Sequence, residues 1–285
     1  MTVNPQSARI VVLGASGQIG RFFCALGGTF AGQSAEIIPV FRNTRAFGQG
    51  VSWHPGAPVP PGLRADAVVA LWGVTRGSDA QLSANSALAE AAIGLARQVG
   101  AGRVVHCSSI AVYAPATAPM AEDWPTRPVN AYGLSKLRME QTALAQSGGG
   151  PRSLCLRIGN VAGADSLFAA GRAQGRITLD RFADGAGPER SYIAPRDMAR
   201  VLAHVALAPL DSLPDVLNVA APGAVAMQAL AGAMGWPVSW RQAPPDARRS
   251  VVMDCSRLAA LCPMPSDAAT AEYLARDVSE LGLVA

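Results

Sequence analysis

Short hydrophobic runs alternate with amphipathic segments along the first 160 residues. Five apolar runs have the length and composition of buried strands, at 9–13, 35–41, 66–73, 103–109 and 153–158. Segments with helical character lie between them, at 21–26, 82–99 and 130–145. Strands that alternate with helices in this way predict an α/β fold with a doubly wound, mostly parallel sheet.

Shorter elements follow residue 221. The pattern predicts helices at 226–234, 256–261 and 269–281 and a strand at 238–240. Together with residues 162–189, these pieces are expected to form a smaller C-terminal lobe beside the sheet domain.

A glycine-rich turn joins the first predicted strand to the first predicted helix. Gly14, Gly17 and Gly20 have the spacing Gly-x-x-Gly-x-x-Gly. Between a strand and a helix, such glycines let backbone N–H groups approach a pyrophosphate, and the helix N-terminus favours the anion. The turn therefore predicts a Rossmann-type dinucleotide site whose contacts are Gly14, Ser16, Gly17, Gln18, Ile19 and Gly20.

The end of the second strand bears on the choice of cofactor. An acidic residue there would bind the ribose 2′-hydroxyl of NAD, whereas an arginine would meet the 2′-phosphate of NADP. The chain has Arg42 and Arg45 in this segment and no acid. We expect NADP, with NAD as the alternative, and Arg42 as the leading contact; the arginines could equally be solvated loop residues. Leu71, Trp72 and Gly73 leave the next strand and should border the cofactor.

Tyr132 and Lys136 are four residues apart in a predicted helix, so their side chains leave the same face. A phenol titrates near ~10, and a nearby ammonium is expected to lower that pKa. Ser109, at the end of a strand, could hold a substrate oxygen against the phenol. The three groups suit proton transfer on an alcohol or carbonyl oxygen while a nicotinamide cofactor moves hydride. The alternative is an ordinary surface pair of Tyr132 and Lys136.

Two polar residues remain ambiguous. Asn85 lies near the start of an Ala-rich helix and is either part of the site or a solvated, cap-like residue. His54 neighbours a Pro-Gly pair in a loop, where a surface position is expected.

Composition narrows the class of protein. The 285 residues carry a net charge of +4, and the 24 Lys and Arg form no basic run, which argues against a nucleic-acid binder. The five cysteines and three histidines show no zinc-ligand spacing, so no metal site is expected. No apolar run is long enough to span a membrane and no signal peptide is recognisable, so a cytoplasmic protein is the default expectation.

Several segments together resemble the extended short-chain dehydrogenase/reductase superfamily, in its NAD-dependent epimerase/dehydratase branch. The resemblance covers nearly the whole length. The segments are the glycine turn at 14–20, the Ser-Ser-x-x-Val-Tyr stretch at 108–113, the Tyr-x-x-x-Lys pair at 132–136, and the later segments 157–163, 190–199, 217–220 and 254–257.

The resemblance implies a function and a division of the chain. Ser109, Tyr132 and Lys136 take the catalytic positions, and Lys136 would also bind the nicotinamide ribose. Ser108, Ser109, Asn160 and Arg190 would contact substrate, with Arg248 and Arg249 as weaker candidates and a salt bridge as the alternative for Arg190. Residues 1–161 with 190–221 would form the dinucleotide-binding domain, and residues 162–189 with 222–285 the substrate-binding lobe.

Departures from the family pattern affect the substrate. Ile158, Ala162 and Ala194 replace its usual Pro, Tyr and His, and the insertion at 164–189 is short. We expect an oxidoreductase or epimerase that acts on a secondary alcohol or ketone of a sugar or sugar-derived substrate, including a sugar nucleotide. Ile110, after Ser109, argues against a dehydratase. A non-catalytic NADP-binding sensor of the same fold is the alternative, and a homodimer is compatible with the family.

Overall fold

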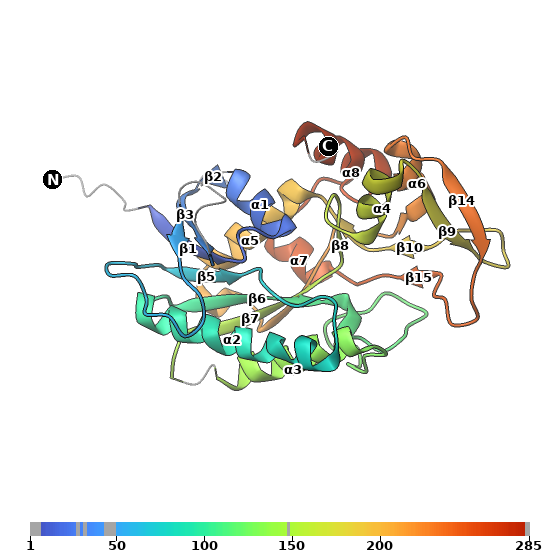
Figure 1. Ribbon diagram of the computed structural model, residues 1–285. Coiled ribbons are helices and arrows are strands. Elements are labelled where there is room, and N and C mark those ends of the chain that lie inside the picture. The colour runs from blue at the N-terminus through green and yellow to red at the C-terminus, as the bar shows by residue number, and fades with distance from the viewer. Residues whose placement is uncertain (1–6, 27–28, 31–32, 43–49, 147–148, 283–285) are drawn as a thin grey trace. The chain divides into compact units, whose positions relative to one another are not determined.

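The computed structural model describes residues 7–26, 29–30, 33–42, 50–146 and 149–282 (Figure 1). The chain divides into two compact units. The first consists of Met1–Val112, Thr126–Arg157 and Ala199–Leu217; the second consists of Tyr113–Pro125, Ile158–Met198 and Asn218–Ala285. The assignment of cofactor to one part of the chain and substrate to another stays a prediction.

A large sheet forms the centre of the first unit. Within the described residues it has eight strands in the order β12-β7-β6-β5-β1-β3-β2, with β4 paired to β3. The strands are β1 (Ala8–Leu13), β2 (Thr29–Phe30), β3 (Gln33–Phe41), β4 (Val51–Ser52), β5 (Ala67–Ala70), β6 (Arg103–Ser109), β7 (Arg152–Ile158) and β12 (Val216–Val219). β1 pairs in parallel with both β3 and β5, and β5 in parallel with β6. The predicted doubly wound, Rossmann-like α/β fold is therefore confirmed.

The strand order reverses direction at β1, whose neighbours are β3 on one side and β5 on the other. At such a switch point the loops leaving the two central strands diverge and leave a crevice beyond their carboxyl ends. The glycine turn follows β1 directly, so the fold places it at this crevice.

Helices cover both faces of this sheet. α2 (Asp79–Val99) and α3 (Ala131–Ala145) run side by side along one face, whereas α1 (Gln18–Ala25) and α5 (Pro195–Leu207) lie on the other (Figure 1). Single turns of 3₁₀ helix occur at Ile110–Val112 and Leu210–Ser212. α2 begins three residues before the predicted start because Ser78 and Gln81 form a reciprocal capping box, which satisfies the free N–H groups of its first turn.

The main hydrophobic core lies between the sheet and α2. Val11 and Leu13 of β1, Val68 of β5 and Ile93 of α2 are all fully buried in one cluster. All four residues of β5 are buried, as expected for a central parallel strand covered on both faces. This core holds the carboxyl ends of β1, β5 and β6 in fixed positions.

The second unit has several small sheets packed on short helices. Its helices are α4 (Ser166–Gln174), α6 (Met227–Ala233), α7 (Ser256–Leu261) and α8 (Ala271–Glu280). Its strands are β8 (Asn160–Val161), β9 (Ile177–Arg181), β10 (Glu189–Arg190), β11 (Tyr192–Ile193), β13 (Val225–Ala226), β14 (Val238–Gln242) and β15 (Ser250–Val251). Phe168 and Trp236 pack edge to face in its core, with ring centroids 5.4 Å apart.

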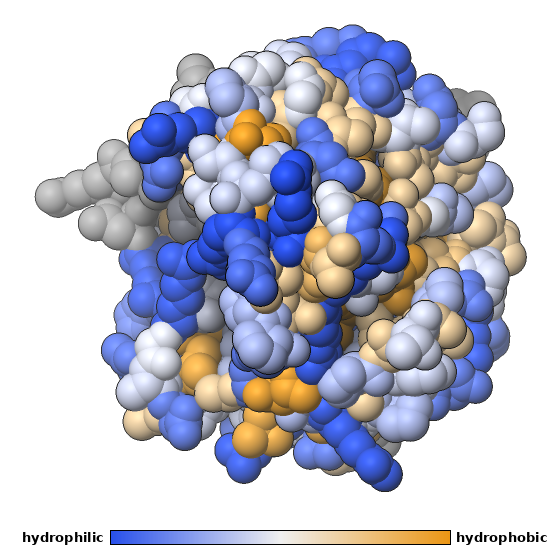
Figure 2. Space-filling view, turned by 90° about the vertical axis from the view of Figure 1, so that its right-hand side faces the viewer, coloured by the Kyte–Doolittle hydropathy of each residue, from blue (hydrophilic) through white to orange (hydrophobic). Residues whose placement is uncertain are grey.

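On the face shown in Figure 2, hydrophobic residues form small patches that are separated by hydrophilic ones. Among the helices that the structure describes, none is both long and apolar enough to cross a lipid bilayer.

Candidate active site

Three successive residues of β6 pair with three residues of α3 that are one helical turn apart. The Ser109 hydroxyl hydrogen-bonds to the Tyr132 side chain, the Cys107 carbonyl accepts from Lys136 at 2.8 Å, and the Ser108 hydroxyl donates to Glu140 at 2.5 Å. Positions 132, 136 and 140 share one face of the helix because the α-helical repeat is 3.6 residues. The end of β6 and one face of α3 therefore form a single polar cluster in the first unit.

The phenol of Tyr132 hydrogen-bonds to Ser109, its predicted partner, but its pKa is raised where a lowering was expected. Burial raises the pKa of Tyr132, the hydrogen bond with Ser109 opposes that rise, and Cys107 adds to it. Lys136 is not among the groups that act on this phenol. The expected lowering of this pKa by Lys136 is thus wrong, because desolvation dominates and the ammonium bonds to β6.

Lys136 is the only lysine in the chain; the other 23 Lys and Arg residues are arginines. Its side chain is buried, and burial lowers the pKa of the ammonium, while Cys107, Cys155 and Glu140 raise it. A Cβ added to Gly73 would lie 3.1 Å from the Lys136 Nζ. The absence of a side chain at Gly73 thus leaves room for the ammonium beside the loop that follows β5.

Glu140 is a buried carboxylate held from two strands. Arg157 of β7 donates to its Oε2 at 2.8 Å and to its Oε1 at 3.1 Å, and Ser108 donates to the same Oε1. All three side chains are buried. The predicted substrate contact of Ser108 is not supported by this geometry, because its hydroxyl points inward to Glu140.

Asn85 is buried and joins α2 to the loop after β5 and to α3. Its Oδ1 accepts from the Val74 N–H at 2.9 Å, and its Nδ2 donates to the Val74 carbonyl at 3.0 Å and to the Ser135 hydroxyl at 3.1 Å. Ser135 in turn donates to the Tyr132 carbonyl. Of the two readings of Asn85, a solvated residue is therefore excluded. Its place one turn into an apolar helix was the sequence signal.

A cavity of about 470 Å³ opens beside the glycine turn. It is lined by Gly14, Ser16, Gly17, Val40, Phe41, Arg42, Trp53, Leu71, Trp72 and Gly73. The structure thus brings together residues predicted from three separate loops, and adds Val40, Phe41 and Trp53. We call it the glycine-turn cavity. Gln18, Ile19 and Gly20 form the first turn of α1 and are not among its lining residues.

Gly14 is held in the left-handed region at φ +80°, and a Cβ there would lie 2.6 Å from the backbone nitrogen of Trp72. Only glycine fits this position without strain, so the turn lies directly against the loop after β5. The Trp72 ring stacks on Trp53 with centroids 6.1 Å apart and an angle of 27° between the planes. One wall of the cavity is therefore an indole pair, which sequence reasoning missed because Trp53 comes from another strand.

Among the described residues, one arginine lines the glycine-turn cavity. Arg42 follows β3, is exposed and lines the cavity. Arg45, the second predicted contact, lies outside the described residues. His54 is exposed, as expected, and its Nδ1 lies 3.0 Å from the Pro55 carbonyl oxygen.

The predicted substrate residues of the second unit are engaged locally. Arg190 donates to the backbone carbonyls of Glu189, Arg249 and Arg248 at 2.7, 3.0 and 3.2 Å. The alternative interpretation of Arg190 was a salt bridge, whereas its contacts here are with backbone carbonyl groups. The Asn160 side chain hydrogen-bonds to Tyr192, and Arg249 pairs with Asp184 at 2.8 Å.

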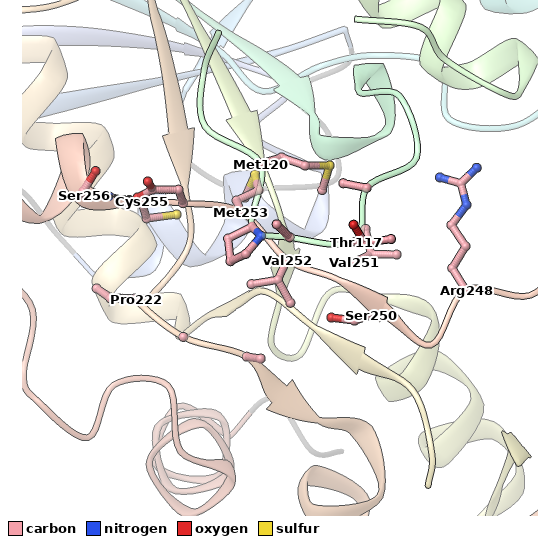
Figure 3. A pocket seen from close by; sticks show the side chains of 16 residues that line it. Thr117, Met120, Pro222, Arg248, Ser250, Val251, Val252, Met253, Cys255 and Ser256 are labelled. Carbon is pink, nitrogen blue, oxygen red and sulfur yellow. Dashed lines mark hydrogen bonds between the residues drawn. The ribbon is translucent and has the colours of Figure 1, made fainter. Parts of the chain in front are cut away.

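A second cavity, of about 500 Å³, lies within the second unit (Figure 3). Met120, Met253, Val251, Val252 and Pro222 give it an apolar wall, and Thr117, Ser250, Ser256 and Arg248 add polar groups. We call it the Met120 cavity. Asn218 ties two of its lining residues together, because its Nδ2 donates to the carbonyls of Met120 and Asp254, both at 2.9 Å. Among the described residues, no cluster of His, Cys, Asp or Glu has the arrangement of a metal site.

A doubly wound sheet whose first strand is followed by a glycine turn, with Ser109 bonded to Tyr132 at the end of β6, is the arrangement of a short-chain dehydrogenase/reductase-like protein. Residues 62–220 match the model of the NAD dependent epimerase/dehydratase family. The chain belongs to this family, as predicted.

One relative matches this chain by sequence over part of its length. A UDP-glucose 4-epimerase of Azospirillum brasilense is 44% identical over 91 residues, which is 31% of this chain and 26% of that protein. The chain thus aligns with about a quarter of that relative's length.

Solved structures resemble the chain over nearly its whole length. They include the NDP-hexosamine 5,6-dehydratase TunA, with TM-score 0.74, 21% identity and coverage of 96% of this chain and 97% of that one. The UDP-glucose 4-epimerase of Brucella ovis in complex with NAD has TM-score 0.75, 17% identity and coverage of 95% and 97%. At such low identity these structures show a common fold.

Proposed function

We propose that the protein is an NAD(P)-dependent epimerase or oxidoreductase that acts on a secondary alcohol or ketone of a sugar-derived substrate. The observation that carries the proposal is the hydrogen bond between Ser109 and Tyr132, with the buried ammonium of Lys136 bound to the carbonyl of Cys107, two residues before Ser109. A hydroxyl pair with an adjacent cation is suited to moving a proton on a carbinol oxygen. Family membership and the names of the relatives point to the same chemistry.

The glycine-turn cavity fits a nicotinamide dinucleotide. Gly14 and Gly17 line the cavity without side chains, the N-terminus of α1 favours a pyrophosphate, and the indole of Trp72 offers a stacking surface for a base. Arg42 is placed to bind a 2′-phosphate and supports NADP, whereas NAD is named for the family and for the Brucella ovis structure. When bound, the cofactor supplies hydride transfer.

Each catalytic residue has a defined task in this proposal. Ser109 orients the substrate oxygen, and Tyr132 holds or donates the proton at its hydroxyl. Lys136 provides positive charge beside them and a hydrogen-bond donor for the cofactor ribose. Because burial is the largest influence on Tyr132 and raises its pKa, the phenol keeps its proton at neutral pH and can donate it.

The composition of the chain supports a special role for Lys136. With 23 arginines and one lysine, arginine is the residue used wherever a surface cation suffices. The guanidinium is larger and planar, and it does not lose its proton at physiological pH. The single ammonium stands at the position that the proposed mechanism gives to a compact cation.

The Met120 cavity is a candidate ligand site within the second unit. Its apolar wall can receive the less polar part of a small ligand, and Arg248 can meet a phosphate or carboxylate. Sugar nucleotides are the substrates named for the relatives, and they are the first compounds to test. Asn160 remains a candidate contact, whereas Arg190 already serves three carbonyls.

The test is a screen of sugars, uronates and sugar nucleotides with NAD and NADP, followed at the absorbance of reduced nicotinamide. Net absorbance change means a dehydrogenase, and product without net change means an epimerase. Tyr132→Phe should abolish turnover and leave cofactor affinity nearly unchanged. If cofactor binds and no substrate turns over in the wild type, the alternative of a non-catalytic NADP-binding sensor takes the place of this proposal.

A further inference from the structure

The first turn of α3 lies directly against the 3₁₀ turn that follows Ser109. A side chain at Gly133 would overlap the Ala111 carbonyl oxygen, and its Cβ would lie 2.9 Å from both the Ala111 carbonyl carbon and the Pro128 Cβ. Non-bonded carbon atoms ordinarily approach one another only to about 3.5–4.0 Å. Gly133 is buried and directly follows Tyr132 in the helix. The helix backbone therefore reaches the turn more closely than any residue with a side chain at position 133 allows.

Ala111 also fixes the hydroxyl of Ser109. Its N–H donates to the Ser109 Oγ at 3.2 Å, in the local turn that serine hydroxyls form with the amide two residues on. A hydroxyl has one proton and two lone pairs. The amide occupies one lone pair, which leaves the proton and the other lone pair for the Tyr132 phenol and a substrate oxygen. Ala111 thus contacts both sides of the site: its N–H meets the serine, and its carbonyl meets the glycine beside the tyrosine.

Asn130 holds the same helical turn from its N-terminal side. Its Oδ1 accepts from the Gly133 N–H at 2.8 Å, which satisfies one of the free N–H groups at the start of α3. Glycine is a poorer helix former than alanine, so helix formation by itself does not favour glycine at this position. Close approach to the turn after Ser109 is the property that only glycine supplies.

We propose that Gly133 and Asn130 are positioning residues for Tyr132. They seat the first turn of α3 on the turn that follows β6, and so hold the phenol at the hydroxyl of Ser109. Both act through the tyrosine, so neither is a catalytic residue itself. Their consequence for turnover rests on the proposed function, whereas the contact between the serine and the phenol exists without substrate or cofactor and can be measured by itself.

The next turn of the helix is held independently. Lys136 donates to the Cys107 carbonyl at 2.8 Å, and this bond does not involve the first turn. An added methyl group at Gly133 should therefore lift the first turn while the later bond stays. The hydrogen bond between Ser109 and Tyr132 is the contact that such a movement lengthens.

Tyrosine labelled with ¹³C at Cζ provides a readout that does not need a substrate. The chain has four tyrosines, so the resonance that is lost in Tyr132→Phe belongs to Tyr132. This resonance moves when the hydrogen bond at the phenol changes. Ser109→Ala removes the bond outright and marks the resonance of the phenol without it. We expect Gly133→Ala to move the Tyr132 resonance toward that position and to leave the other tyrosine resonances in place.

Turnover gives a second readout once a substrate is known. Gly133→Ala should lower kcat by roughly 10- to 100-fold, because a small displacement of a catalytic group has a large effect on rate. KM and cofactor affinity should stay near the wild-type values, since Gly133 is not among the residues that line the glycine-turn cavity. If the wild type turns over no substrate, the proposed function fails, and the Tyr132 resonance alone decides this inference.

Gly94→Ala is the matched control. It makes the same change in α2, where nothing lies within 4 Å of the new Cβ. The control should keep every tyrosine resonance and the wild-type kcat. A Tyr132 resonance at the wild-type position in folded Gly133→Ala would overturn the proposal, as would an equal displacement in the control.

A pair of variants at Asn130 decides the question if Gly133→Ala does not fold. Asn130→Ala removes the cap without adding an atom to the turn, whereas Asn130→Asp keeps an oxygen that accepts from the Gly133 N–H. We expect Asn130→Ala to displace the Tyr132 resonance in the direction of Ser109→Ala, and Asn130→Asp to leave it at the wild-type position. An undisplaced resonance in Asn130→Ala would overturn the proposal just as directly.

Discussion

The ε-ammonium of Lys136 donates a hydrogen bond to the carbonyl oxygen of Cys107 at 2.8 Å, so the one lysine of the chain is bound to the end of β6. Cys107 immediately precedes the two serines of the site. The bond therefore ties the cation to β6 two residues before Ser109, whose hydroxyl bonds to Tyr132 one turn earlier on α3.

Lys136→Arg tests whether the site needs an ammonium. The ammonium bonds to the Cys107 carbonyl at 2.8 Å and would lie 3.1 Å from a Cβ at Gly73, so the larger guanidinium should displace the loop after β5. We expect turnover to fall by on the order of 10²-fold or more, as for loss of a group that supports proton transfer. Arg138→Lys, an exposed change on the same helix, should leave turnover unchanged. Wild-type turnover in Lys136→Arg would contradict the role of the compact cation.

Gly73→Ala tests the space beside the ammonium. The new Cβ would lie 3.1 Å from both the Lys136 Nζ and the Asn85 Oδ1, so either group must give way. We expect turnover to fall roughly 10- to 100-fold, because small displacements of catalytic groups have large effects on rate. Gly94→Ala in α2 is the control, since nothing lies within 4 Å of its Cβ. That control should raise the free energy of unfolding by about 0.5–1 kcal/mol and keep full activity.

Trp72→Ala tests the indole wall of the glycine-turn cavity. Stacking of a base on an aromatic ring is worth about 1–3 kcal/mol, so NADPH affinity should fall roughly tenfold. Indole fluorescence should be quenched when NADPH binds to the wild type and much less in the variant. Trp240→Phe, in the second unit, should retain both the affinity and most of the quenching. Equal quenching in wild type and Trp72→Ala would remove Trp72 from the cofactor site.

Arg42→Ala tests the preference for NADP. Loss of a charge-assisted hydrogen bond to the 2′-phosphate should weaken NADPH binding by about 10- to 100-fold and leave NADH binding almost unchanged. Calorimetric titration with each cofactor measures the difference. Arg64→Ala is the control, because Arg64 is exposed and donates to the adjacent Leu63 carbonyl instead. An equal loss for the two cofactors would mean that Arg42 does not select between them.

His106→Gln tests the response of stability to acid. Burial lowers the pKa of His106 to about 3, from an ordinary value of 6.5. The folded state keeps this imidazole neutral while the unfolded chain takes up a proton below pH 6.5. Its contribution is therefore fully present above pH 6.5 and is lost as pH falls toward 3.

Urea denaturation between pH 7 and pH 4 measures that dependence. As pH falls, the free energy of unfolding should decrease more steeply for the wild type than for His106→Gln. The difference between the two slopes should correspond to the uptake of up to one additional proton on unfolding. His54→Gln, at an exposed loop position, should behave as the wild type. Parallel slopes for wild type and His106→Gln would show that His106 is not kept neutral by the fold.

Local sequence determined much of this protein. The apolar runs that became β1, β5, β6 and β7, the glycine turn, and the Tyr132–Lys136 spacing all depend on neighbours within a few residues, so the sequence sufficed to predict the α/β sheet and the family. Helical periodicity likewise sufficed to place positions 132 and 136 on one face.

Tertiary structure alone decided the rest, because those features depend on which segments meet in space. The Ser108–Glu140–Arg157 cluster joins two strands and a helix, and the pairing of Trp53 with Trp72 joins loops after different strands. The direction of the Tyr132 pKa also belongs to the folded chain, since burial outweighs the spacing of charges along one helix. Sequence separation says little about desolvation, which is set by everything that packs around a group.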